Sequence, residues 1–284
     1  MNNNVTIILV SFYAYENLVR YLNQFKKKFK IIIVDNSNDK RILAHKKKNI
    51  EILINKKNLG FGSSVNVAFK KVKTKYALHV DLDTKLSNKG ICKLVNKANQ
   101  IKDFVMMVPK IKNYNYKKKD FITKNLYKNI HHMNYVDGCC MLFEMQEIKK
   151  IGFFDKNFFL YFEETDLQKR IIEQSKKILM YDQTLIYHQG RSSSEKKFNY
   201  EIELNRNWHF MWSKFYFFKK HYGYVEAILR IFKHFYSSFF KYFFYKFTMN
   251  EKKKLIYYCR FSGCWNAILL KSSWYRPNIQ ILKN

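Results

Sequence analysis

Proline and glycine are scarce in this chain, with 2 prolines and 8 glycines among 284 residues. Collagen-like and most disordered proteins need many of both. This chain is instead 47% hydrophobic and 18% aromatic. These fractions exclude a disordered or fibrous protein, and they are sufficient for one large α/β domain with an appendage.

Acidic residues are also few. The chain has 22 Asp and Glu against 53 Lys and Arg, which gives a formal net charge of +31. Such an excess favours anionic partners, namely nucleic acid, anionic lipid or phosphorylated substrates. Abundant Lys, Asn, Ile, Phe and Tyr is also what an A/T-rich genome encodes. The charge therefore does not choose among these partners.

The chain has five cysteines, an odd number, and no C-x-x-C pair. Cys139 and Cys140 lie in an apolar run, which predicts reduced core residues of a cytosolic protein. The N-terminus has no basic segment, and the apolar run at 5–10 is too short for a signal peptide. No uncharged window of about 18 apolar residues exists, so we expect no transmembrane helix.

Apolar runs alternate with helical spacing through the first 110 residues. Strands are predicted over 5–10, 31–34, 50–54, 76–80 and 104–109, and helices over 16–29, 60–72 and 90–101. This alternation predicts parallel βαβ units with helices on both faces of a mainly parallel sheet. Further strands are predicted over 136–143 and 178–187. The Lys- and Asn-rich segment 110–134, which has no clear period, predicts a long loop.

Two carboxylates follow the strand at 76–80. Asp81 and Asp83 are separated by one residue, and ligands of open α/β sheets bind outside the carboxyl ends of strands. Hard oxygen ligands in so basic a chain indicate a divalent cation that holds a phosphorylated ligand. A polar turn after a strand would look the same, so the pair has to be judged with the rest of the chain.

Two segments nearer the N-terminus could bind a nucleotide. Asp35 ends the second strand, where a carboxylate can accept hydrogen bonds from a base or a ribose, although Asp-Asn-Ser is equally good turn chemistry. Asn58 and Gly60 open a helix, whose first N–H groups suit an anion. A plain helix cap would have the same sequence.

Two later segments supply acids and a histidine. Glu163, Glu164 and Asp166 lie within four residues after a run of aromatic residues, and a carboxylate beside apolar walls has a raised pKa and can act as a general base. His188 follows a strand and precedes Arg191, so this segment could supply a metal ligand and phosphate-binding donors.

Taken in order, these motifs resemble glycosyltransferase family 2. The series is Asp35, 58–62, Asp81-Leu82-Asp83, Asp137-Gly138, 152–155, 163–166 and 188–193. It is most similar to the rhamnosyltransferase-like branch and spans residues 5 to about 215. The resemblance implies a GT-A fold and inverting transfer from a nucleoside-diphosphate sugar, such as a UDP- or dTDP-sugar.

The resemblance also implies roles for single residues. Asp83 and His188 would bind Mg²⁺ or Mn²⁺, and Asp81 would contact the ribose or the metal shell. Asp35 would meet the nucleobase, with Asn58, Gly60 and Arg191 as further donor-binding residues. The catalytic base would be Glu164, the second residue of the Glu163-Glu164 pair, with Asp166 as its competitor. The first strand of many members ends in Asn, whereas Ser11-Phe12-Tyr13 stands here, so the resemblance implies that this chain would lack one nucleotide contact.

The final third differs in kind, and we expect a catalytic domain over 1–198 and a helical, basic and aromatic region over 199–284. Between 226 and 247 a polar stripe (Arg230, Lys233, His234, Ser237, Ser238, Lys241 and Tyr245) runs beside a wide aromatic face. This amphipathic helix predicts either in-plane docking on an anionic membrane or packing against the catalytic domain or a second subunit.

The function predicted from the sequence is thus sugar transfer to a growing bacterial surface glycan, of capsule or lipopolysaccharide type, or to a lipid-linked acceptor. The enzyme would be cytoplasmic and peripheral on the inner face of the cytoplasmic membrane. One alternative is a nucleotidyltransferase on a related fold, although the Gly-rich, Lys-bearing loop is absent. Another is a basic nucleic-acid-binding protein, for which no zinc-finger or RRM signature is present.

Overall fold

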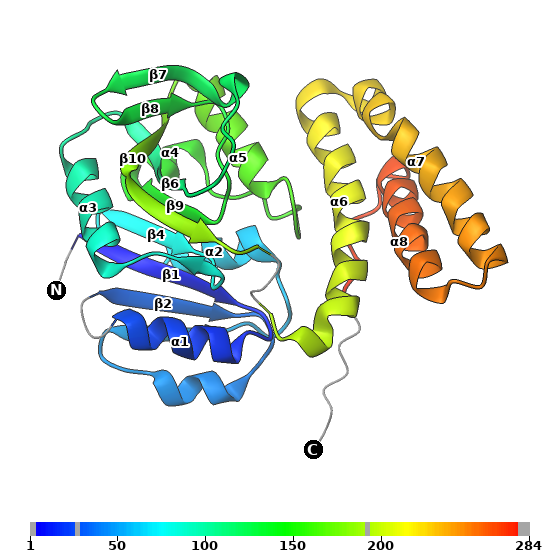
Figure 1. Ribbon diagram of the computed structural model, residues 1–284, viewed down its shortest axis with the longest axis horizontal. Coiled ribbons are helices and arrows are strands. Elements are labelled where there is room, and N and C mark those ends of the chain that lie inside the picture. The colour runs from blue at the N-terminus through cyan, green and yellow to red at the C-terminus, as the bar shows by residue number, and fades with distance from the viewer. Residues whose placement is uncertain (1–3, 26–28, 191–193, 278–284) are drawn as a thin grey trace. The chain divides into compact units, whose positions relative to one another are not determined.

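The computed structural model describes residues 4–25, 29–190 and 194–277 (Figure 1). It divides into two compact units. The first comprises Met1–Phe154 and Glu164–Glu195, and the second comprises Asp155–Glu163 and Lys196–Asn284.

The first unit is an α/β domain with a mixed, mostly parallel sheet. Its strands are β1 (Val5–Ser11), β2 (Lys30–Asp35), β3 (Ile50–Ile54), β4 (Tyr76–Val80), β5 (Thr84–Lys85), β6 (Phe104–Ile111), β7 (Phe121–Tyr127), β8 (Ile130–Met133), β9 (Cys140–Glu144) and β10 (Lys177–His188). The order is β3-β2-β1-β4-β9-β6-β10-β8-β7, and β5 pairs with β10. Strand β9 runs antiparallel between β4 and β6.

Within the described part of this unit, five α-helices cover the sheet. They are α1 (Tyr15–Phe25), α2 (Phe61–Phe69), α3 (Asn88–Asn99), α4 (Met145–Ile151) and α5 (Glu163–Glu173). Helices α1 and α3 bury their apolar sides in one cluster with alternate residues of β1, whereas α2, α4 and α5 pack in a second cluster on the opposite face. The predicted three-layer α/β architecture is therefore confirmed, and the strands up to residue 109 lie within two residues of their predicted positions.

The segment 110–134 is not the long loop predicted from its composition. It contains a 3₁₀ turn at Lys118–Asp120 and then the antiparallel pair β7 and β8. Five of the seven residues of β7 are exposed, because β7 is the edge strand of the sheet. Its lysines and asparagines therefore face solvent. The segment consequently lacks the alternation of apolar and polar residues by which a strand is predicted.

The described part of the second unit is an assembly of three α-helices. It contains α6 (Asn199–Tyr222), α7 (Tyr224–Phe247) and α8 (Glu251–Ile268), preceded by a 3₁₀ turn at Lys196–Phe198. Trp208 and Phe215 of α6 lie at its core with Ile231 of α7. Gly263 of α8 allows a close approach, since a Cβ there would lie 2.3 Å from the carbonyl oxygen of Trp208.

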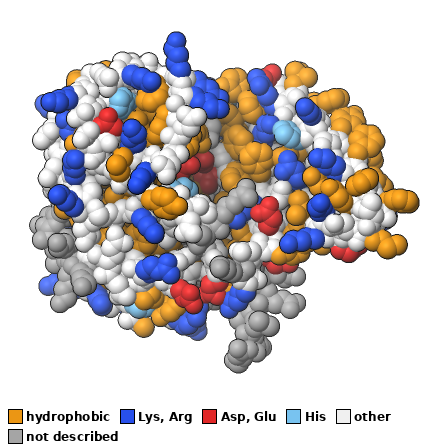
Figure 2. Space-filling model, viewed as in Figure 1, with side chains coloured by type: hydrophobic (Ala, Val, Ile, Leu, Met, Phe, Trp, Pro, Cys, Tyr) orange, Lys and Arg blue, Asp and Glu red, His pale blue; other side chains and the backbone are white. Residues whose placement is uncertain are grey.

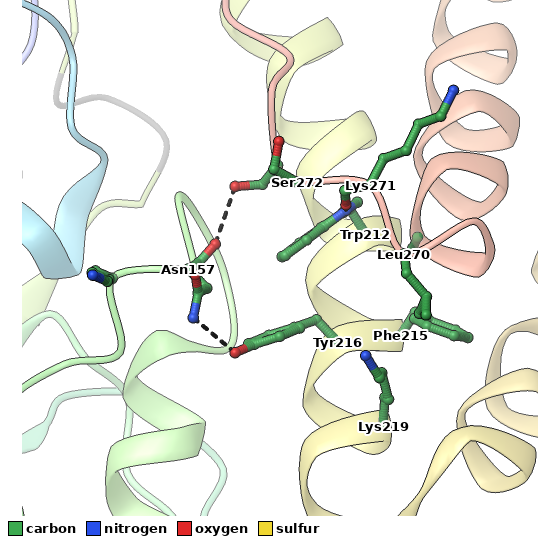
Figure 3. A pocket seen from close by; sticks show the side chains of 11 residues that line it. Asn157, Trp212, Phe215, Tyr216, Lys219, Leu270, Lys271 and Ser272 are labelled. Carbon is green, nitrogen blue, oxygen red and sulfur yellow. Dashed lines mark hydrogen bonds between the residues drawn. The ribbon is translucent and has the colours of Figure 1, made fainter.

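The segment Asp155–Glu163 joins this helical unit through hydrogen bonds. Asn157 donates to the hydroxyl of Tyr216 over 2.9 Å, and its carbonyl accepts from Ser273 over 3.0 Å (Figure 3). Lys220 lies 2.9 Å from Asp155. These bonds explain why a segment from the middle of the chain belongs to the C-terminal unit.

Among the described residues, no helix is both long enough and apolar enough to cross a bilayer. The described cysteines are free thiols, and Cys139 and Cys140 are buried, as their apolar setting predicts.

Candidate active site

Three candidate metal ligands converge at the carboxyl end of β4. Ligand atoms of Asp81, Asp83 and His188 lie within 4.8 Å of one another. Nε2 of His188 lies 3.4 Å from Asp83 and 4.0 Å from Asp81. The two carboxylates are oxygen ligands of the kind that Mn²⁺ and Mg²⁺ prefer, and the imidazole adds a nitrogen donor. The cluster is consistent with a divalent metal site.

The short strand β5 explains why residues far apart in sequence meet here. His188 pairs with Thr84, the residue after Asp83, in the β5–β10 ladder. The Gln189 amide also donates to the carbonyl of Asp83 over 3.2 Å. Between the two carboxylates, Leu82 is buried and anchors the loop. A hydrogen bond from His188 to the Asp83 carboxylate raises the pKa of the imidazole.

Asp81 has a partner, His79, that was not predicted as a site residue. Nε2 of the buried His79 lies 3.0 Å from Oδ1 of Asp81. Side chains two residues apart in an extended segment point to the same side. The order His79-Val80-Asp81 could therefore have predicted a contact between His79 and Asp81. His79 thus contacts the Asp81 carboxylate, whereas His188 lies closer to Asp83 than to Asp81.

Asp137 is a second residue that was given no role. Its Oδ1 accepts from the Cys139 amide over 2.9 Å and lies 3.9 Å from Nδ1 of His188. The Cys139 carbonyl in turn accepts from the Asp81 amide over 2.9 Å. The turn before β9 therefore places another carboxylate beside the candidate metal cluster.

Glu164 lies next to this turn, at the start of α5. A Cβ on Gly138 would approach the Glu164 side chain to 3.4 Å, so the glycine leaves room beside the carboxyl group. Burial raises the pKa of Glu164 to about 7, and the charges of Asp137 and Asp81 add to the rise. A carboxyl group with such a pKa can take up a proton near neutral pH.

The other two candidate bases are placed differently. Glu163 is a buried residue at the first position of α5. Asp166 is fully buried, and its Oδ2 accepts from Nε of Arg170 over 2.9 Å. The same guanidinium donates to the carbonyls of Ile151, Gly152 and Phe153. The Asp166–Arg170 pair thus fastens the Gly152 turn to α5.

The two predicted nucleotide-binding segments lie at the same edge of the sheet. Asp35 ends β2, which neighbours β1, and β1 neighbours β4. The Asp35 carboxylate is buried and accepts from the Ser37 hydroxyl over 2.6 Å and from the amides of Ser37 and Asp39. Burial raises its pKa. The turn chemistry expected of Asp35 is therefore present, and contact with a nucleobase stays a prediction.

Asn58 and Gly60 form the entrance to α2. Oδ1 of Asn58 accepts from the Gly60 amide over 2.9 Å, and Gly60 has φ of 82°, a value that favours glycine. Asn36, which was not predicted as a site residue, accepts from the Leu59 amide and from Ser64. These bonds tie the loop after β2 to the loop before α2. Arg191 lies outside the described residues.

Comparison with known proteins identifies the family. The model of the family described as "Glycosyl transferase family 2" matches residues 6–166, which is more than half of the chain. The chain belongs to this family. The matched segment contains the α/β unit from β1 to the start of α5, including the two strand-end carboxylates and Glu164. No curated protein sequence matches the chain.

Solved structures show the same fold at low sequence identity. GalNAc-T7, crystallised with UDP, GalNAc and Mn²⁺, gives a TM-score of 0.55 at 14% identity over 83% of this chain and 58% of that one. The mannosyltransferase PcManGT from Pyrobaculum calidifontis, in complex with GDP-Man and Mn²⁺, gives 0.54 at 10% over 95% and 88%. Residues 1–349 of TarS from S. aureus give 0.54 at 15% over 93% and 91%.

Proposed function

We propose that this glycosyltransferase is metal-dependent and inverting, and that it moves a sugar from a nucleoside-diphosphate sugar to a hydroxyl group of an acceptor. The observation that carries the proposal is the pairing of two features in one unit. The cluster of Asp81, Asp83 and His188 suits a divalent cation, and Glu164 beside it has a pKa of about 7.

In this proposal one group of residues acts on the diphosphate leaving group, and Glu164 acts on the acceptor hydroxyl. Asp83 and His188 would hold Mn²⁺ or Mg²⁺, with Asp81 in the metal shell or on the ribose. When bound, the cation supplies neutralisation of the charge on the diphosphate leaving group. Glu164 accepts the proton of the acceptor hydroxyl as its oxygen attacks the anomeric carbon and the bond to the diphosphate breaks.

A single displacement of this kind inverts the anomeric centre. A retaining double displacement needs a second carboxylate as nucleophile close to the anomeric carbon. Asp81, Asp83 and Asp137 surround the candidate metal site, and Asp166 is engaged by Arg170. Glu164 is then the carboxylate best suited to act as base, which supports inversion.

Donor class and cellular setting complete the proposal. The neighbours with UDP and with GDP-Man support a nucleotide sugar as donor, and UDP- and dTDP-sugars are the donors proposed here. The proposed acceptor is a growing surface glycan or a lipid-linked glycan. The exposed aromatic residues of α7 support a peripheral position on the inner face of the cytoplasmic membrane. The rhamnosyltransferase-like branch rests on motif order alone.

A thermal-shift screen of UDP-, dTDP- and GDP-sugars with Mn²⁺ tests the donor class. A ligand that binds only the native state raises the melting temperature, so at least one sugar nucleotide has to do so more than its free nucleoside. Proton NMR of the first product then reports the anomeric configuration. A product that retains the donor configuration would refute the inverting mechanism.

A further inference from the structure

The helical unit contains a cavity unrelated to the candidate active site. It has a volume of about 380 Å³ and is lined by residues of all three helices. Asn207 comes from α6, His234, Ser237, Ser238 and Lys241 come from α7, and Ile256, Tyr257 and Arg260 come from α8. Lys241 and Arg260 bring positive charge to its walls, and Ser237, Ser238 and Tyr257 bring hydroxyl groups.

Positively charged side chains lie close together at this cavity, and they form no ion pair with a carboxylate of the described residues. Lys214 of α6 lies 2.9 Å from Nε2 of His234, and Arg260 donates to Oδ1 of Asn207 over 3.1 Å. Within the described part of the chain, no carboxylate lies within 4.0 Å of the charged groups of Lys214, Lys241 or Arg260. The nearby Glu203 accepts from Asn207 and does not line the cavity.

The same crowding is visible in the electrostatics. Burial lowers the pKa of Lys214, and the charges of Arg230 and Arg260 lower it further. Burial also lowers the pKa of His234, together with the charges of Lys214 and Arg260. Like charges held together in this way are relieved by an anion. Several N–H donors and two serine hydroxyls suit the oxygens of a phosphate group.

A row of exposed aromatic side chains runs along α7 beside this cavity. Its members, Phe232, Tyr236, Phe240, Phe243 and Phe247, recur at intervals of three or four residues. All are exposed, with Phe240 at 66% and Phe247 at 87%. Hydrophobic side chains and Lys and Arg side chains are intermingled over α7 and α8 (Figure 2). Such a surface is typical of a helix that lies in a membrane interface.

The aromatic face predicted from the sequence is thus divided between two roles. Phe235 packs on Phe261 of α8 with ring centroids 5.0 Å apart, and Tyr242 packs on Tyr258. Phe232 and Phe243 of the predicted face lie instead in the exposed row, together with Tyr236, Phe240 and Phe247, which were not predicted as part of that face. Lys233, Ser237 and Lys241 each follow a member of the row by one residue and so lie along one edge of it.

We propose that the cavity between α6, α7 and α8 is a phosphate-binding site, and that its phosphate belongs to the headgroup of an anionic membrane lipid. The aromatic row is the reason to choose a lipid over a soluble phosphate, because it places apolar side chains where acyl chains would lie. The proposal rests on the membrane position proposed above and is independent of the transfer reaction.

Vesicle binding by the full chain tests this site. We expect sedimentation with vesicles that contain phosphatidylglycerol and weak sedimentation with phosphatidylcholine alone. The double variant Lys241→Gln with Arg260→Gln should bind phosphatidylglycerol vesicles roughly 25-fold more weakly, from about a factor of five per lost cation. The control Lys71→Gln with Lys73→Gln, two exposed lysines of the α/β unit, removes the same charge and should change binding less than about twofold.

Three further measurements keep the outcome decisive. Ser237→Glu places a carboxylate at an exposed position of the cavity wall and should weaken vesicle binding even if the double variant does not fold. Glycerol phosphate without acyl chains should bind far more weakly than vesicles, and equal affinity would overturn the lipid assignment. Asp83→Asn should bind vesicles normally. Wild-type vesicle binding by both cavity variants, or losses no larger than in the control, would overturn the proposal.

Discussion

Replacing Glu164 by Gln removes the proposed base while keeping the shape of its side chain. The amide cannot accept a proton from the acceptor hydroxyl. Loss of a positioned general base costs about 10²–10⁴ in rate. We therefore expect kcat to fall by that factor with little change in donor affinity, because the residues proposed to hold the donor are untouched.

The raised pKa of Glu164 gives the same substitution a second signature. The group has a pKa of about 7 instead of 4.5. Because folding raises this pKa, the folded protein binds the proton more tightly than the unfolded chain does. The resulting stabilisation is complete below the pKa of the unfolded state, and it is lost as the pH rises from there through 7. Ionised Glu164 then costs the fold up to ~3 kcal/mol at pH 8. Glu164→Gln should raise the melting temperature at pH 8 and leave it unchanged near pH 4.

The pH profile of the wild type follows from the same group. A base works only when it is ionised, so kcat/KM should rise about tenfold between pH 6 and pH 8 if the pKa stays at 7. A bound cation offsets the charges of Asp81 and Asp137, which moves the midpoint lower. The ascending limb should disappear in Glu164→Gln.

The assay is release of nucleoside diphosphate, with chemical denaturation of each variant measured alongside. Asp166→Asn is the matched comparison, because Asp166 is the competing candidate and lies two residues away. It should lower stability by weakening the Arg170 contact and leave kcat of the folded protein within a few-fold. The reasoning is refuted if Asp166→Asn loses the activity and Glu164→Gln keeps it.

Three further predictions concern the fold and the metal. Arg170→Met should lower the free energy of unfolding by ~3–5 kcal/mol in urea, because it leaves the buried Asp166 carboxylate without its cation. Lys169→Met, which breaks the pair with the exposed Glu173, should cost less than ~1 kcal/mol, and equal costs would contradict the role of the Asp166–Arg170 pair. Gly263→Ala should destabilise the helical unit by ~1–3 kcal/mol, and an unchanged melting temperature would contradict its contact with a backbone carbonyl. His188→Ala should weaken Mn²⁺ binding at least about tenfold by calorimetry, and unchanged affinity would remove it from the site.

The fold was largely predictable because its strands are buried on both faces. Runs such as Ile7 to Leu9 and Ile31 to Val34 are continuous apolar segments, which are typical of strands in a parallel sheet. The edge strand β7 was not predictable by the same means, because it buries almost nothing. Residues 110–134 therefore looked like a loop, although they add two strands to the sheet.

The site was predicted only in part, because some of its residues stand in one local stretch of sequence and others meet only through tertiary pairing. Carboxylates at strand ends, Asp81 and Asp83, are visible in one local stretch. The approach of His188 to Asp83 depends on the pairing of β5 with β10, more than 100 residues apart, which no local pattern displays. The tie between Asp166 and Arg170 has helical i, i+4 spacing, yet only the packing shows that it holds the Gly152 turn.

The measurement that tests the central claim most directly is turnover of a nucleoside-diphosphate sugar by the wild type and by Asp83→Asn, with and without Mn²⁺. The wild type should release nucleoside diphosphate with Mn²⁺, lose this activity in EDTA and regain it when Mn²⁺ is restored. Asp83→Asn should melt like the wild type and be inactive in both conditions. Full activity of Asp83→Asn, or of the wild type in EDTA, would contradict a metal-dependent glycosyltransferase.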